Sequence, residues 1–283
     1  MLRLLGTIFA ALLGLAFGSF LNVCLSRWPE GESIVHPRSH CRTCTRTLLW
    51  WENIPILSWM ALLGRCRTCN ALIHWRYPLV EAAVGILWAY IAWSFLPYLP
   101  DGGVTVSFSS GYLLEHLVLF PLTWLFVALA FLDAEHLWLP DFLTLPGIVL
   151  GFAFRTAFAA IGNQYFRYRL WPTAWLNLRA ILIAAAIILV IRLVYWLFRR
   201  QEGIGLGDAK LMAMLAAWLG LPGALLSFFF GVILGALVAI PLLLTKRAAT
   251  AKLPLGTFLC IGGIVTALWG RQIIDTYLTW AGF

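Results

Sequence analysis

Residues 180–198 read AILIAAAIILVIRLVYWLF, and Arg192 is the one charged residue among them. A helix needs about 20 largely apolar residues to cross the hydrocarbon core of a bilayer. This stretch is long enough, and comparable stretches recur along the chain. We therefore predict an all-α polytopic membrane protein with about eight transmembrane helices, over residues 4–25, 78–99, 113–132, 142–160, 178–198, 209–221, 223–244 and 255–274.

The composition supports this fold class. The chain is 62% hydrophobic and 11% charged, with a mean hydropathy of +0.88, whereas soluble domains carry about 25% charged residues. No small-residue cleavage site follows Leu4–Val23, so we expect a retained helix and not a removed signal peptide. The net charge of +8 comes from basic residues in loops between apolar segments, which indicates a lipid bilayer as partner and no nucleic acid.

The segment at 209–221 is the weakest of the eight. It is short, and Pro222-Gly223 after it is typical of a tight turn. A re-entrant segment is the alternative, and it would change the topology of everything that follows.

The basic residues also predict an orientation. Thirteen Lys and Arg residues fall in the loops after the first, third, fifth and seventh segments, and six fall on the opposite side. Cytoplasmic loops carry the excess of positive charge. We therefore expect the first set of loops to be cytoplasmic and both termini to be periplasmic.

One sizeable polar region interrupts the apolar chain, which suggests three parts. These are a first transmembrane helix at 1–25, a cytoplasmic loop domain at 26–77, and a transmembrane domain at 78–283. A region of about 50 residues buries little core by itself, and such domains commonly need a metal or disulfides.

Four cysteines in this loop form two C-x-x-C pairs. Cys41 and Cys44 make the first, and Cys66 and Cys69 make the second. Paired motifs of this kind indicate zinc, which favours a tetrahedron of four thiolates and would here be structural because no coordination position stays open. Two disulfides or redox cysteines are the alternative, which a cytoplasmic location disfavours.

Two acids stand at the edges of apolar segments, where an ionisable group is costly and indicates function. Asp133 follows the segment at 113–132, and Asp208 ends the run Gly203-Ile204-Gly205-Leu206-Gly207-Asp208. Two predicted crossings separate the acids. They should therefore lie on the same membrane face, whichever way the protein is oriented.

Two carboxyls at close range share a proton, so one can take a proton from water while the other donates to a scissile carbonyl. Asp133 lies at a helix end, where the dipole disfavours a negative charge. A negative charge on Asp208 is favourable at the start of a helix, so its position alone does not indicate catalysis. The glycine run before it makes Asp208 a catalytic candidate, because glycines let the backbone approach a ligand or adopt conformations closed to other residues. No β-strand precedes these glycines, so nucleotide binding is not expected.

Other polar residues have open alternatives. Asp141 follows Pro140 and either caps the next helix or supports the active site. Glu81 either snorkels at the membrane edge or contacts the substrate or a cofactor amine.

Several motifs together resemble those of the type IV prepilin peptidases, the leader peptidase/N-methyltransferases of pilus and type II secretion systems. They extend over nearly the whole chain, and are Gly18-Ser19-Phe20-Leu21-Asn22-Val23, the two cysteine pairs, Trp51-Glu52-Asn53-Ile54-Pro55, Arg76-Tyr77-Pro78-Leu79-Val80-Glu81, Asp133 with Pro140-Asp141, and Gly203-Ile204-Gly205-Leu206-Gly207-Asp208-Ala209-Lys210.

The resemblance implies an aspartyl protease of the bacterial inner membrane that removes the basic leader of prepilins or pseudopilins on the cytoplasmic side. It also implies N-methylation of the new N-terminus with S-adenosylmethionine. Its matching catalytic acids are Asp133 and Asp208, and its supporting or substrate-binding residues are Asp141, Gly205, Gly207, Lys210 and Glu81.

One departure from the family lies at Leu253-Pro254-Leu255-Gly256-Thr257, where relatives commonly have Pro-Phe-Gly-Pro. We expect this change to alter the turn into the last helix without touching the acids. A non-catalytic zinc-knuckle scaffold of a secretion or pilus machine is the alternative function. A proton-coupled transporter is a third, disfavoured because the acids lie at the membrane edge and not at its midplane.

Overall fold

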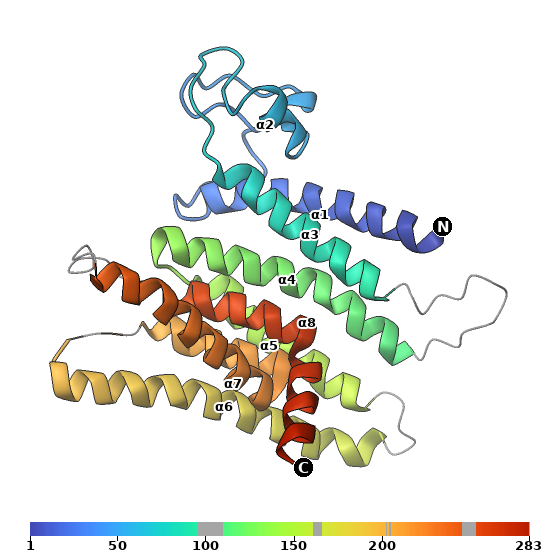
Figure 1. Ribbon diagram of the computed structural model, residues 1–283, viewed down its shortest axis with the longest axis vertical. Coiled ribbons are helices and arrows are strands. Elements are labelled where there is room, and N and C mark those ends of the chain that lie inside the picture. The colour runs from blue at the N-terminus through green and yellow to red at the C-terminus, as the bar shows by residue number, and fades with distance from the viewer. Residues whose placement is uncertain (96–109, 161–165, 202, 204, 245–252, 283) are drawn as a thin grey trace. The chain divides into compact units, whose positions relative to one another are not determined.

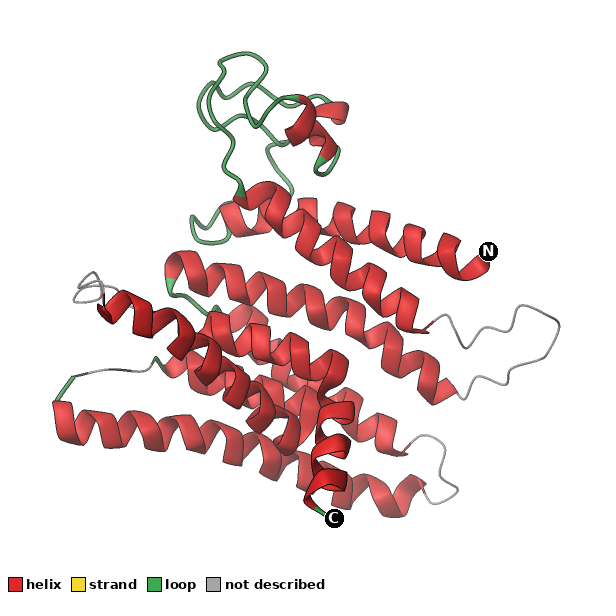
Figure 2. Ribbon diagram, viewed as in Figure 1, coloured by secondary structure: helices red, strands yellow, loops and turns green. Residues whose placement is uncertain are grey.

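The computed structural model describes residues 1–95, 110–160, 166–201, 203, 205–244 and 253–282. Apart from two isolated β-bridges, these residues form helices and loops, as Figures 1 and 2 show. The helices are α1 (Leu2–Arg27), η1 (Trp50–Asn53), α2 (Leu57–Ala61), α3 (Arg76–Phe95), α4 (Ser110–His136), α5 (Asp141–Ala160), α6 (Phe166–Arg199), α7 (Leu206–Leu244) and α8 (Leu255–Ala281).

Seven of the described helices are long and apolar enough to cross a membrane: α1 and α3 through α8. The prediction of an all-α membrane protein is confirmed. The count differs from eight because the segments predicted at 209–221 and 223–244 form the single element α7. A straight helix of that length would measure about 58 Å, roughly twice the thickness of the hydrocarbon core.

The element α7 is broken at Gly220, which has φ 75° and ψ 175°. The predicted turn at Pro222-Gly223 therefore lies two residues earlier. Figure 1 shows both ends of α7 on the same side of the C-terminal part, so its two halves run in opposite directions. Counted as two halves, α7 supplies the two segments predicted from the sequence.

The chain forms two compact units, Met1–Ala128 and Leu129–Phe283. In the first unit, α1 packs against α3 through glycines of α1. A Cβ added to Gly18 would lie 2.7 Å from the Cα of Glu81, and one on Gly14 would lie 2.9 Å from the carbonyl oxygen of Val84. Small residues of this kind allow close approach of membrane helices.

The first half of α7 forms the core of the second unit. Residues 211–217 are buried, and α7 packs against α5, α6 and α8. The segment that looked weakest in the sequence is therefore the most enclosed helix of this unit. It can be short in apolar length because neighbouring helices, and not lipid, surround it.

Candidate active site and metal centre

Asp133 lies in the last turn of α4 and is buried, with 5% of its surface exposed. Its Oδ2 accepts a hydrogen bond of 2.7 Å from the backbone N–H of Thr257, and the Thr257 hydroxyl lies 3.2 Å away. Thr257 stands in the first turn of α8, where backbone N–H groups have no partner within the helix. Asp133, at the end of α4, thus provides a hydrogen-bond acceptor for a free backbone N–H at the start of α8.

These contacts correct one expectation from the sequence. The segment at 253–257 does touch an acid, because Thr257 donates to Asp133 and a Cβ on Gly256 would lie 2.9 Å from Asp133 Cγ. The sequence singled out this segment but gave no sign of its neighbour, which is 124 residues away.

Asp208 is the third residue of α7 and is also buried. Its Oδ2 accepts a 3.1 Å hydrogen bond from the backbone N–H of Gly205, the residue before the helix. An acid in the third position that binds back to the N-cap N–H is half of a capping box. The local sequence therefore fixes the position of this carboxyl.

The structure brings the two acids together. Their carboxyls are close enough to interact electrostatically, and the side chain of Leu139 joins their surroundings. A Cβ on Gly207, next to Asp208, would lie 3.2 Å from Leu139, and a Cβ on Gly256, beside Asp133, would lie 2.9 Å from it. Two helices, α5 and α6, separate the acids along the chain, and the prediction that both acids lie on the same membrane face agrees with this arrangement.

The glycine run before Asp208 does not act through unusual backbone conformations. Gly203, Gly205 and Gly207 are not among the residues with positive φ, so this expectation was wrong. Gly207 is needed for close packing against Leu139, and a Cβ on Gly203 would lie 2.6 Å from the ring of Tyr195. At Gly205 the space is open, and Asp208 is the nearest side chain.

Asp141 is the first residue of α5 and forms an ion pair with Lys210 of α7. The side chains are 58% and 36% exposed, respectively. Among the described contacts, the Asp141 side chain makes no capping hydrogen bond to the start of α5. Its ion pair with Lys210 instead connects α5 to the turn of α7 that carries Asp208.

Glu81 lies in α3, in the N-terminal unit, and is buried. Its Oε2 accepts a 2.7 Å hydrogen bond from the backbone N–H of Ile56, and the side chains of Ser19 and Asn22 in α1 lie beside its carboxyl. Glu81 therefore does not snorkel, because its carboxyl fastens the returning loop to the helix pair.

The four cysteines of the loop lie within one cluster. All their sulfur atoms are within 4.8 Å of one another, and none of them forms a disulfide. Cys41 Sγ is 3.8 Å from Cys69 Sγ, and Cys44 Sγ is 4.0 Å from Cys66 Sγ. A tetrahedral ion with bonds of about 2.3 Å to sulfur separates its ligands by about 3.8 Å, so the cluster fits a metal.

The two cysteine pairs have the same local structure. The carbonyl of Cys41 accepts from the N–H of Thr45, and the carbonyl of Cys66 accepts from the N–H of Asn70. Thr45 and Asn70 both have positive φ. Backbone N–H groups of Cys69 and Thr68 lower the pKa of Cys66, whereas burial and the neighbouring thiols raise the pKa of Cys69.

A buried acid braces the first pair. Glu52 of η1 accepts from the Arg46 guanidinium at 2.7 Å and from the Leu49 backbone N–H at 2.8 Å. The Arg46 side chain holds the pKa of the Glu52 carboxyl below its usual range. Glu52 of the Trp51-Glu52-Asn53 motif therefore has a structural role.

Both parts of the chain match known protein families. Residues 12–95 match the family model described as Bacterial Peptidase A24 N-terminal domain, and residues 119–240 match Type IV leader peptidase family. A prepilin leader peptidase/N-methyltransferase of Pseudomonas aeruginosa is 35% identical over 303 residues, covering 96% of this chain and 93% of the relative. This chain belongs to the type IV leader peptidase family.

Other members of the family show similar agreement. The prepilin leader peptidase/N-methyltransferase of Stutzerimonas stutzeri is 34% identical over 96% of this chain and 93% of its own length. That of Myxococcus xanthus is 40% identical over 86% of this chain and 64% of its own length. No solved structure is significantly similar. Asp133 and Asp208 fall within the leader peptidase match, and the four cysteines fall within the N-terminal match.

Proposed function

We propose that this membrane protein removes the leader from type IV prepilins or pseudopilins with Asp133 and Asp208 as its catalytic pair. The burial of both carboxyls around the side chain of Leu139, within electrostatic range of each other, carries the proposal. Supporting it, both acids lie in the segment that matches the leader peptidase family, and the curated relatives are named prepilin leader peptidase/N-methyltransferase.

The geometry suggests how the pair works. Each carboxyl is held through Oδ2 by a backbone N–H, from Thr257 for Asp133 and from Gly205 for Asp208. This leaves Oδ1 of each acid to exchange a proton. The ionised carboxylate takes a proton from water as the water oxygen attacks the scissile carbonyl, and the protonated one donates to the carbonyl oxygen. The C–N bond then breaks as the leaving amine takes the proton that came from water, and a hydroxyl of the intermediate returns a proton to the other carboxylate.

Supporting residues hold this arrangement. Gly205 supplies the N–H that binds Asp208, Gly207 admits Leu139, and Lys210 pairs with Asp141. We place this face in the cytoplasm and both termini in the periplasm of the inner membrane, because the loops on this side hold thirteen basic residues against six opposite.

The second activity in the relatives' name is N-methylation, and we extend it to this chain. S-adenosylmethionine supplies an electrophilic methyl group when bound. For the cysteine cluster we propose a structural zinc ion held by Cys41, Cys44, Cys66 and Cys69, since four thiolates leave no open position.

Cleavage of a synthetic prepilin by the purified protein in detergent tests the peptidase function. We expect Asp133→Asn and Asp208→Asn each to lower the rate by about 10²- to 10⁴-fold, the usual size of a general acid–base contribution. Asp275→Asn is the matched control, because Asp275 is 68% exposed and pairs with Arg271. Full cleavage by either active-site variant would refute the pair and favour the scaffold function, which requires the cysteines but not the acids.

A further inference from the structure

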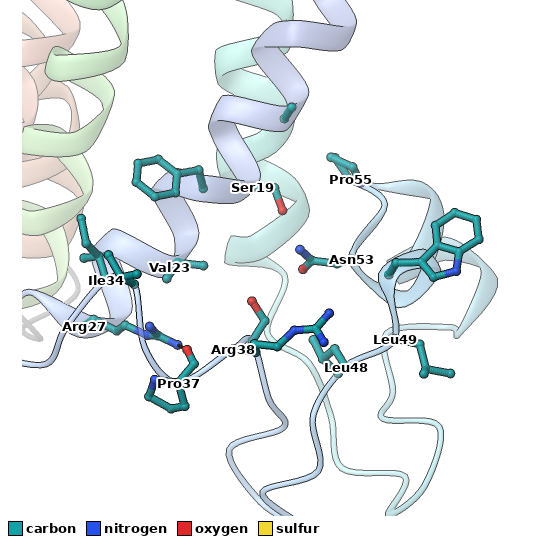
Figure 3. Close-up of a pocket in the computed structure, with 15 residues that line it drawn as sticks. Ser19, Val23, Arg27, Ile34, Pro37, Arg38, Leu48, Leu49, Asn53 and Pro55 are labelled. Carbon is teal, nitrogen blue, oxygen red and sulfur yellow. Dashed lines mark hydrogen bonds between the residues drawn. The ribbon is translucent and has the colours of Figure 1, made fainter.

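A cavity of about 540 Å³ lies in the N-terminal unit, between the last turns of α1 and the loop that carries the cysteines (Figure 3). Binding sites for small molecules typically measure about 300–1,000 Å³. All the lining residues fall between 16 and 55, within the match to the N-terminal domain and outside the match that contains the two acids. The residues that build the cavity are therefore different from those that carry the proposed peptidase pair.

Hydrogen bonds fix two walls of this cavity. Arg27 is 5% exposed and donates to the carbonyl oxygens of Ser33 and Pro37, at 2.7 and 2.6 Å. On the other side, Glu52 fastens η1, which ends at Asn53, by accepting from Arg46 and Leu49. The cavity is thus built by the fold and needs no ligand to form its walls.

Three polar side chains point into the same space in Figure 3: Ser19, Arg38 and Asn53. Among the described residues Arg38 has no ion-pair partner, and no acid lines the cavity. A guanidinium with an adjacent amide is suited to a carboxylate or another planar anion. Apolar side chains such as Val23, Ile34 and Leu48 form the remaining wall and can cover a flat ring.

The carboxyl of Glu81 lies behind the wall on the Ser19 side, next to the Ser19 hydroxyl. The cavity therefore offers a guanidinium at Arg38, polar groups at Ser19 and Asn53, and an apolar wall. A ligand with an anionic end and a flat ring matches this distribution.

We propose that this cavity binds S-adenosylmethionine, with the carboxylate of its methionine part on Arg38 and Asn53 and its adenine on the apolar wall. The proposal rests on the methyl transfer proposed above. In that step the lone pair of the neutral N-terminal amine forms the N–CH₃ bond as the S–CH₃ bond breaks. The bonding pair stays on sulfur, which becomes a neutral thioether, and one amine proton leaves to water.

Binding of S-adenosylhomocysteine to the full-length protein in nanodiscs, measured by calorimetry, tests the assignment without turnover. Loss of one charge-assisted hydrogen bond should weaken binding about 10- to 100-fold in Arg38→Ala. Arg38→Lys should recover part of the affinity, because it keeps the charge but not the planar fork. Val23→Trp should block binding by filling the cavity.

Arg65→Ala is the matched control, because Arg65 is exposed on the same loop and does not line the cavity. Prepilin cleavage by every variant shows that it is folded, and separates failure of this assignment from failure of the peptidase function. Unchanged affinity in both Arg38→Ala and Val23→Trp overturns the proposal. So does a result in which Arg38→Ala weakens binding of phosphatidylglycerol vesicles but not of S-adenosylhomocysteine.

Discussion

The backbone N–H of Thr257 donates to Oδ2 of Asp133 over 2.7 Å. The two residues are 124 positions apart and belong to α8 and α4. Asp133 is therefore positioned by the first turn of another helix as well as by its own. Any change that shifts the start of α8 should move this carboxyl.

Gly256→Ala should disable cleavage while leaving the protein folded. The new Cβ would lie 2.9 Å from Asp133 Cγ and 2.9 Å from Leu139, closer than real Cβ contacts. A misplacement of about 1 Å in a catalytic group can lower the rate on the order of 100-fold. Single-turnover cleavage of a prepilin peptide measures the effect.

Gly235→Ala serves as the control for this substitution. Its Cβ would meet Phe258 at 3.4 Å, an ordinary contact, so cleavage should stay close to that of the unsubstituted protein. Equal rates for the Gly256 and Gly235 variants would show that Asp133 does not depend on the start of α8.

The ion pair between Asp141 and Lys210 should contribute little to stability. Both side chains are at least 36% exposed, and such pairs contribute about 0.2–1 kcal/mol. We expect Asp141→Asn and Lys210→Met each to slow cleavage less than about tenfold, because they loosen the helical turn that carries Asp208 without removing an acid. In a double-mutant cycle the combined loss should be smaller than the sum. A loss as large as that of Asp208→Asn would assign Lys210 a direct chemical role.

Metal analysis of the purified protein should find one zinc ion per chain. Serine at Cys41, Cys44, Cys66 or Cys69 should remove it, because each thiol is within reach of the other three. Cys24→Ser and Cys260→Ser are the controls, since both of these thiols are buried in helices and neither belongs to the cluster. Retention of zinc in a serine variant of the cluster would contradict the four-thiolate site.

Gly220→Ala should lower the apparent Tm by several degrees. At φ 75° and ψ 175°, a region essentially restricted to glycine, a side chain costs about 1–3 kcal/mol, and a Cβ there would also collide with the guanidinium of Arg155. Gly31→Ala separates the two causes, because Gly31 has φ 70° with open space around it. If both variants melt alike, the contact with Arg155 has no effect on stability.

The helices and the two acids could be predicted from the sequence because both depend on chain order. Apolar length identifies a crossing, and two crossings between Asp133 and Asp208 place them on one face. The surroundings of Asp133 could not be predicted in this way. Its position at the end of α4 is unfavourable on that helix alone, and the compensating N–H comes from Thr257 of α8.

Packing also decided what the sequence left open. The segment at 209–221 looked too short to span, yet α5, α6 and α8 enclose it. The glycines before Asp208 looked like a flexible run, yet Gly207 is fixed by the side chain of Leu139. Both facts depend on neighbours from distant parts of the chain.

The paired sulfur contacts have a mechanical consequence for the loop. Cys41 lies against Cys69, and Cys44 against Cys66, so a bound ion would cross-link the two ends of the intervening chain. A protease that cuts once between Thr45 and Arg65 would then leave two fragments still joined through the ion. A chelator that removes the ion would free the two cut ends of the loop from each other, while the packing of α1 on α3 still holds the fragments together. The ion would thus act as a reversible cross-link within the loop.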